Sequence, residues 1–335
     1  MKRLTFYTNE KISQARLVFR QLTINSIDDG NRFFEAFCPG NTINVADRPF
    51  ERFQDYETFL KILRDDDQIK YEKIHKGTPF YFLAWTAFDL KNYEKAVFYM
   101  DAAISEDIRA LPKNWINTPA SQFITLNHEG NQAAKGITEE LRNEVLDQLN
   151  RFNAISGLNS IDIDSFVNNF VKFLVIQKEN HSIITALYSY LLEFKDIYLA
   201  LLLRSTEGGS IEPALTYLFK GSLIFESLLK HLYPNKDNRR DKCETLGDVF
   251  KTSAFKTEFT TTRISTTAST LEEILRSIGG NGLHTAFTVT SKLRNTTGHN
   301  LTWVDVFDEP DNLKKFYEQQ VNAILYIAQK KFLEH

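Results

Sequence analysis

The stretch "GTPFYFLAWTAFDLKNYEKAVFYMDAAISED" at residues 77–107 decides the fold class. Its apolar and small residues recur every three or four positions, which is the spacing of one face of an α-helix and not the alternation of a strand. "DLKN" at 89–92 interrupts that spacing. We therefore predict two helices, at about 77–90 and 92–108. They should pack through two facing sets of side chains: Phe80, Leu83, Ala84 and Ala87 on the first, and Ala96, Met100 and Ala103 on the second.

This helical hairpin resembles one tetratricopeptide repeat in its pattern of small and aromatic positions, although Ile108 stands where such a repeat has its closing proline. A solenoid needs three or more repeats to bury a continuous core. An ordinary helical hairpin, with the same packing needs, therefore stays open as the alternative. The resemblance implies a helical surface that binds a peptide, a protein or a small activator.

The same helical spacing continues through most of the chain, and the eight prolines fall mainly between such stretches. The sequence thus predicts an all-α protein. We assign no helix to the first 50 residues and interpret "CPGNTINVADRP" at 38–49 as a loop between helices. Further helices are expected at about 50–64, 137–152, 163–178, 181–205, 211–233, 244–252, 270–278, 283–297 and 310–333.

Two polar breaks that contain glycine are candidate domain boundaries: "NHEGNQAAKG" at 127–136 and "ISGLNSID" at 155–162. A chain of 335 residues is long enough for two domains. We prefer the second break, which predicts an N-terminal helical domain at 1–155, tetratricopeptide-like and suited to sensing or binding, and a second helical domain at 156–335.

Composition places the chain among ordinary globular proteins, with 42% apolar and 25% charged residues. A net charge of −3 argues against a general nucleic-acid coat protein but leaves room for a local basic cleft. Cys38 and Cys243 form neither a disulfide framework nor a zinc pattern. The N-terminus lacks a signal peptide, and the longest apolar run, "IYLALLL" at 197–203, is too short to span a bilayer. We expect a cytoplasmic protein with no membrane contact.

The stretch "LRNTTGHNL" at 293–301 contains a cationic side chain, Arg294, and a side chain that can transfer protons near neutral pH, His299. The apolar spacing before it predicts a helix that Gly298 ends, because glycine readily takes the left-handed backbone of a helix terminus. Arg294 would then lie in the last turn, and His299 just past it. A turn at Gly298 can fold the imidazole back toward the guanidinium.

This segment resembles the R-x4-6-H motif of the HEPN superfamily, in which asparagine often follows the arginine. "GSLIFESLLKHLYP" at 221–234 and "TLGDVF" at 245–250 are similar to the long helix and the short helix that precede the motif. The resemblance covers roughly residues 165–335 and implies a C-terminal HEPN helical bundle. It further implies a homodimer in which two copies of the motif form one cleft.

The family implies RNA cleavage without a metal or other cofactor, through attack of a ribose 2′-OH on the neighbouring phosphate. His299 would move protons, Arg294 would bind the phosphate charge, and Asn295 would bond the phosphate or orient His299. Glu226 would hold the rotamer of Arg294, and a solvated glutamate on a helix face is the alternative. The sequence contains no metal-ligand spacing such as paired histidines at i and i+4.

Two loops are candidates for substrate contact. "PNKDNRRDK" at 234–242 gathers Lys236, Arg239, Arg240 and Lys242, which would contact the RNA backbone or form an ordinary solvated loop. The Thr-rich segment at 255–270 predicts an exposed loop or a short extended excursion, because its hydroxyls compete for backbone hydrogen bonds. Substrate contact, dimerisation and a mobile insertion are the alternatives there.

The leading hypothesis is a homodimeric endoribonuclease that acts as a toxin or antiviral defence effector. Its N-terminal domain would bind an activator ligand, an antitoxin or a protein partner. The alternatives are a non-catalytic HEPN module that binds a nucleotide or serves as a scaffold, and a repeat-type adaptor that binds proteins through residues 77–108.

Overall fold

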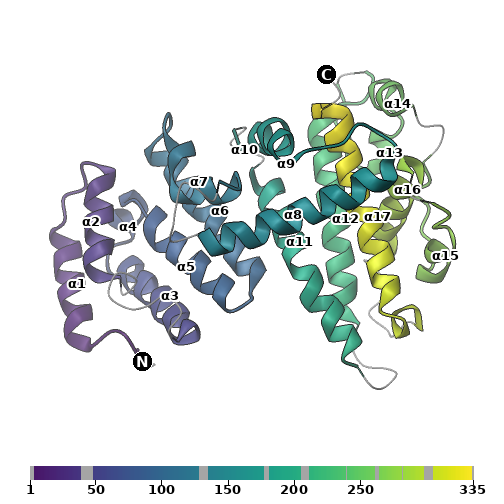
Figure 1. Ribbon diagram of the computed structural model, residues 1–335. Helices are drawn as coiled ribbons and strands as arrows, with labels where there is room; N and C mark the ends of the chain where they lie inside the picture. The colour runs from purple at the N-terminus through teal and green to yellow at the C-terminus, as the bar shows by residue number, and fades with distance from the viewer. Residues whose placement is uncertain are drawn as a thin grey trace. The chain divides into compact units, whose positions relative to one another are not determined.

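A computed structural model describes residues 4–38, 48–127, 135–176, 181–204, 211–238, 240–260, 264–280, 282–297 and 305–333. The protein is all-α, as predicted, and the described residues contain no strand. A single antiparallel bridge between Asn235 and Lys242 is the one β-type pairing among them. The chain divides into two compact units, residues 1–141 and 142–335 (Figure 1).

The first unit consists of the predicted hairpin and of the helices that precede and follow it in the sequence. The hairpin itself is confirmed: α5 (Gly77–Asp89) packs against α6 (Tyr93–Ala110), with Leu83, Ala87 and Ala103 fully buried. The other elements of this unit are α1 (Asn9–Gln21), α2 (Ile27–Phe37), α3 (Pro49–Asp66), α4 (Gln68–Lys73), the 3-10 turn η2 (Trp115–Asn117), α7 (Pro119–Ile124) and the start of α8 (Lys135–Ser156).

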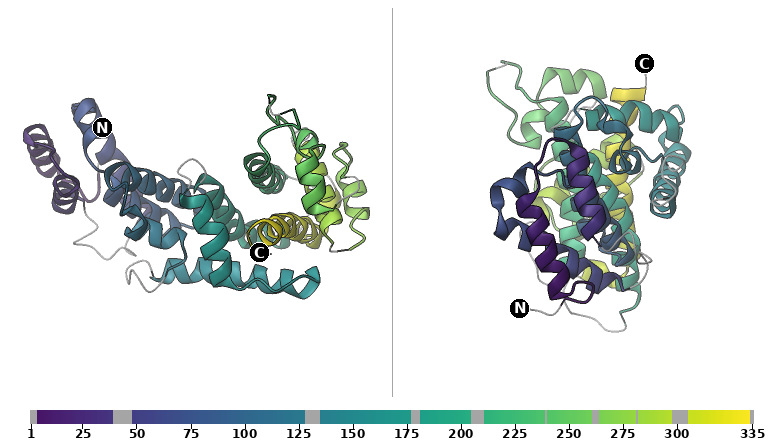
Figure 2. Two further views of the ribbon diagram at one scale, coloured as in Figure 1. Left: turned by 90° about the horizontal axis from the view of Figure 1, so that it is seen from above. Right: turned by 90° about the vertical axis from the view of Figure 1, so that its left-hand side faces the viewer.

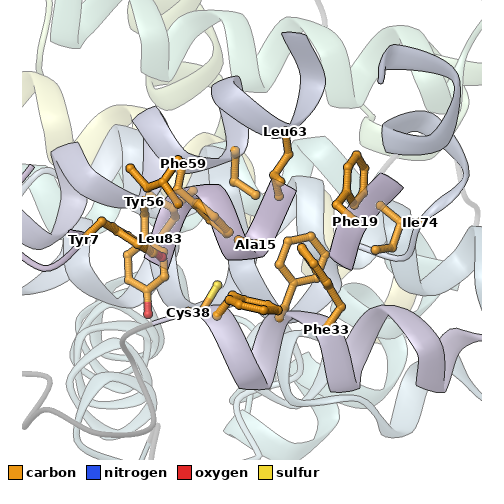
Figure 3. Close-up of a cluster of buried hydrophobic side chains, with 14 of the residues drawn as sticks. Tyr7, Ala15, Phe19, Phe33, Cys38, Tyr56, Phe59, Leu63, Ile74 and Leu83 are labelled. Atoms are coloured by element: carbon orange, nitrogen blue, oxygen red, sulfur yellow. The ribbon is translucent and has the colours of Figure 1, made fainter. Parts of the chain in front are cut away.

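Helices α1 and α2 lie in the first 50 residues, to which the sequence analysis assigned no helix. The Thr8 side chain caps α1 by accepting from Lys11 N, and Ser26 with Asp29 forms a capping box at the start of α2. Their apolar faces fill the core of the unit, where Phe19 of α1 and Phe33 of α2 lie 5.4 Å apart between ring centroids. Figure 3 shows this core, in which Tyr7 stacks on Phe59 of α3.

The second unit is built around four helices, of which α12 packs against each of the other three: α11 (His181–Leu202), α12 (Glu212–Leu232), α16 (Leu283–Thr296) and α17 (Asp311–Ala328). Figure 2 shows the molecule from two further directions. Shorter elements surround them: α9 (Ile163–Ser165), the π-helix η4 (Phe166–Val171), α10 (Lys172–Ile176), α13 (Leu246–Val249), α14 (Ser253–Phe259), α15 (Leu271–Arg276), the 3-10 turn η5 (Asp305–Asp308) and the π-helix η6 (Gln329–Leu333).

A buried hydrogen-bond network links α11, α12 and α17. Tyr190 of α11 donates from its hydroxyl to Gln320 Oε1 of α17 at 2.6 Å. Gln320 Nε2 donates in turn to Ser222 Oγ of α12 at 2.7 Å and to Leu218 O at 2.6 Å. Gly221 makes this approach possible, because a Cβ there would lie 2.6 Å from Tyr190 Cζ.

Helix α14 corrects the interpretation of residues 255–270 as a loop. Thr252 caps the helix by accepting from Phe255 N at 3.3 Å. Phe255 and Phe259, four residues apart, are buried against Phe287 of α16 at centroid distances of 6.1 and 5.3 Å. Aromatic burial at helical spacing therefore outweighs the low helix propensity of the neighbouring threonines.

The division between the two compact units falls between residues 141 and 142, within α8. The predicted domain boundary between residues 155 and 156 lies at the last residue of this helix and stays a prediction. The last residues of α8 belong to the second unit because they pack there. Phe152 lies edge-on to Tyr326 of α17, with centroids 4.8 Å apart. Lys195 of α11 pairs with the buried Glu144 at 2.6 Å. Of the helices searched along the described residues, none combines the length and the apolar character that crossing a bilayer requires.

Candidate phosphate-binding site

The candidate site lies at the C-terminal end of α16, which ends at Thr296 as the sequence suggested. Thr297 closes the helix, with its N–H and its hydroxyl both donating to Leu293 O, at 2.9 and 2.8 Å. Arg294 therefore lies in the last turn. Gly298 and His299 lie outside the described residues.

Glu226 of α12 is the buried centre of the site. Arg294 donates from Nε to Glu226 Oε2 at 2.7 Å, and Lys230 Nζ lies 2.7 Å from the other carboxylate oxygen, Oε1. The Glu226 side chain is only 5% exposed, whereas those of Arg294 and Lys230 are 40% and 32% exposed. A buried carboxylate thus fixes two cations whose side chains remain partly exposed. We call these three residues the Glu226 cluster.

Packing between α12 and α16 sets the position of this cluster. Phe225, next to Glu226 in the chain, packs edge-on against Phe287 with centroids 5.0 Å apart. One turn earlier, Ser222 Oγ donates to Thr290 O at 3.2 Å, one turn before Arg294 on α16. Both side chains of the ion pair therefore start from helix segments that the core holds in place.

Asn295 anchors the Thr-rich segment to the end of α16. Its Nδ2 donates to Thr266 O, and its Oδ1 lies 3.5 Å from Arg294 Nη1. The next residue, Thr296, donates from Oγ1 to Ser269 O at 2.7 Å and accepts from Ser269 N at 3.3 Å. Residues 264–270, which we call the strap, are thus tied beside the arginine and are not a freely exposed loop.

The predicted basic loop is a folded turn after α12. Lys236 N donates to Asp241 O at 2.9 Å, and Cys243 N donates to Pro234 O at 2.8 Å. The Lys236 ammonium lies 3.4 Å from Asp248 of α13. Arg240 and Lys242 are exposed, and Arg239 lies outside the described residues.

Cys243 of this loop is under the influence of several charges. Burial is the main cause that raises the pKa of its thiol, followed by the charge of Asp248, while the charges of Lys236 and Lys230 act in the opposite direction.

The structure brings Arg294, Asn295 and Glu226 together, while the roles assigned to them stay predictions. Lys230 and Thr266 complete the surroundings of Arg294 and were missed from the sequence. "ESLLK" at 226–230 carried a usable signal, because Glu and Lys four residues apart on a helix face each other. The backbone contact of Thr266 left no such signal. Within the described ranges, no group of three or more His, Cys, Asp and Glu side chains could hold a metal ion.

Comparisons of the chain with protein-family models, with curated proteins and with solved structures gave no match.

Proposed function

We propose that this chain is a metal-independent endoribonuclease of the HEPN type that acts as a homodimer, with Arg294 and His299 as its catalytic residues. One observation carries the proposal. Arg294 of the R-x4-H motif is held through Nε by a buried carboxylate while its side chain stays 40% exposed. A fixed guanidinium of this kind can bind phosphate oxygens without first losing its own rotamer freedom.

The reaction balances without an oxidant, a reductant or a second substrate. The ribose 2′-oxygen forms a bond to phosphorus as its proton passes to a base, and the bond from phosphorus to the 5′-oxygen breaks as that oxygen gains a proton. The products are a 2′,3′-cyclic phosphate and a 5′-OH. His299 is the group that can transfer protons near neutral pH. Arg294 stabilises the charge that develops on the phosphate.

Asn295 has a positioning role in this proposal. Its Nδ2 donor is occupied by Thr266 O, so it holds the strap beside Arg294. Lys236, Arg240 and Lys242 would contact the RNA backbone beyond the cleaved bond, together with Arg239. Such contacts supply affinity and register without sequence information. A toxin or antiviral defence effector, restrained or activated through the first unit, is the biological role that this activity would suit.

The test is cleavage of labelled single-stranded RNA in excess chelator by wild type, Arg294→Ala and His299→Ala, each shown to be dimeric by light scattering. We expect each substitution to slow cleavage by roughly a hundredfold or more. Two matched controls exist in the same unit. Arg276→Ala truncates an exposed arginine at the end of α15, and His284→Ala truncates an exposed histidine at the start of α16.

The proposal is supported if wild type and both controls cleave the RNA to cyclic-phosphate ends and both site variants do not. Cleavage that needs a metal and survives both substitutions would contradict it. An inactive wild type, even with cell extract as a source of activator, would favour a non-catalytic HEPN module.

One observation favours a protein-binding role as a second candidate. Phe98 on the outer face of α6 is 65% exposed and lies edge-on to Tyr99, with ring centroids 5.2 Å apart. Tyr99 donates to Glu57 Oε1 of α3 at 2.6 Å, which holds its ring in place. A partner that binds this hairpin should lose affinity with Phe98→Ser but not with Arg294→Ala. The opposite pattern would exclude the adaptor role at this surface.

A further inference from the structure

The charge balance of the Glu226 cluster suggests a function for Lys230. A buried carboxylate that is paired with Arg294 alone would form a neutral unit, and its negative oxygens would repel an approaching phosphate. Lys230 occupies the second carboxylate oxygen, Oε1, at 2.7 Å. Two cations and one anion leave a formal charge of +1 at the end of α16.

The geometry of α12 favours this arrangement over an incidental surface pair. Glu226 and Lys230 are four residues apart, with the glutamate N-terminal, which is the better orientation for an i, i+4 pair on a helix. The carboxylate is buried and its two oxygens are divided between the two cations, so neither cation replaces the other. Both cations keep about a third or more of their side-chain surface exposed.

We propose that Lys230 is a positioning residue of the phosphate site: it offsets the charge of Glu226, so that the carboxylate can hold Arg294 without cancelling its attraction for phosphate. The ligand class is the phosphodiester backbone of a single-stranded nucleic acid. This inference rests on the proposed function for its ligand, but it concerns binding, which can be measured apart from cleavage.

The experiment measures binding of a short 2′-O-methyl oligouridine, which lacks the attacking hydroxyl and cannot be cleaved, to the full-length chain at low salt. Lys230→Met should bind roughly tenfold more weakly, because one unit of positive charge is lost beside the ligand. Lys230→Arg keeps the charge and should bind like wild type. Lys61→Met is the matched control, because it removes the same charge from an exposed i, i+4 ion pair on α3.

The double variant Lys230→Met with Glu226→Gln separates the charge effect from a structural one. The glutamine removes the negative charge that Lys230 offsets, and its Oε1 can still accept from Arg294, so the double variant should bind like wild type. Glu226→Gln alone should bind more tightly than wild type. Lys230→Met removes one unit of positive charge in either background, so the two single effects should cancel in the double variant.

Three results would overturn the inference: unchanged binding by Lys230→Met, a double variant that binds more weakly than wild type by the same tenfold, or a wild type that does not bind the oligouridine. The failures of the two proposals are distinct. If the predicted order of affinities holds but wild type does not cleave ordinary RNA, only the nuclease proposal fails. If wild type cleaves RNA and Lys230→Met binds the oligouridine normally, only the role of Lys230 fails.

Discussion

Two buried carboxylates, one from each unit, lie opposite nitrogen-containing side chains, and the two arrangements differ in what surrounds the partner. In the first unit, Asp107 of α6 lies with Oδ1 2.9 Å from His75 Nε2, and both side chains are buried. Asn31 Oδ1 lies 3.3 Å from the other ring nitrogen and accepts from Thr78 Oγ1 at 3.1 Å. Both ring nitrogens of His75 therefore lie opposite buried or partly buried protein groups.

In the second unit, Glu226 is equally buried, but its partners Arg294 and Lys230 reach the surface. The contacts of a closed set such as that of Asp107 hold α2, α5 and α6 together. An open set gives up part of that stability and keeps its cations accessible. The two sets therefore differ in the exposure of the partner and not in the burial of the carboxylate.

The largest difference should appear when the partner of each carboxylate is removed. His75→Ala leaves Asp107 buried and without its ring partner, and should lower the free energy of unfolding by about 3 kcal/mol. Arg294→Ala leaves Lys230 on Glu226 and should cost less than about 1 kcal/mol. Urea unfolding followed by tryptophan fluorescence measures the loss caused by His75→Ala, since Trp85 and Trp115 both lie in the first unit. Equal losses would refute the distinction between closed and open sets.

A second test adds a single methyl group inside the closed set. A Cβ on Gly77 would lie 2.6 Å from both Asp107 Oδ1 and His75 Cε1. Gly77→Ala should therefore destabilise the protein by about 2 kcal/mol, after the gain in helix propensity is taken into account. Gly279→Ala is the control in the second unit, because nothing lies within 4 Å of a Cβ there. A neutral Gly77→Ala would mean that the closed set can relax.

A third test asks whether Asn295 serves the strap. Asn295→Ala removes the bond to Thr266 O and should cost about 1 kcal/mol of local stability. Amide hydrogen exchange should then quicken in residues 264–270 and stay unchanged in α12. Asn238→Ala, which alters a side-chain bond within the basic loop, is the matched control. Unchanged exchange in the strap would remove the positioning role from Asn295.

The smallest effect is the pH dependence of stability at two helix caps, Asp29 in the first unit and Asp248 in the second, which should titrate alike. Backbone N–H groups of Asn25 and Ser26 lower the pKa of Asp29, and the N–H of Thr245 is the main cause that lowers the pKa of Asp248. A lowered pKa contributes stability above the ordinary value of 3.8, and this contribution is lost as the pH falls through the native pKa. Carboxyl titration by NMR should give both midpoints below 3.8. A midpoint at or above that value would show that the cap is not formed.

The sequence predicted those parts of the fold in which helical spacing extends over several turns. The hairpin α5–α6 and the long helices α8, α11, α12, α16 and α17 were expected from such spacing. Helices α1 and α2 were missed although Thr8 and the pair Ser26 and Asp29 carried capping signals. Helix α14 was missed because the threonines around it have low helix propensity, and only the distant Phe287 reveals why it folds.

The candidate site was predictable only where it is local in sequence. The relation of Arg294 to Asn295 and to the end of α16 follows from the motif itself. The bond from Arg294 to Glu226 joins residues 68 positions apart, and it was expected only through the HEPN resemblance. The contact of Asn295 with Thr266 depends on the path of an irregular segment, which has no periodic signal.

One stripe of α12 gives the molecule a property that matters for its engineering. Leu218, Ser222, Glu226 and Lys230 follow one another at intervals of four residues, and Gln320 bonds the first two of them. A slip of α12 by a single residue would move Glu226 by about 1.5 Å along the helix axis and turn it by about 100°. The amide of Gln320, two turns away, therefore sets the register in which Arg294 and Lys230 meet their carboxylate. A core redesign that replaces Gln320 would therefore disturb the contacts of Glu226 with Arg294 and Lys230, although none of these three residues is changed.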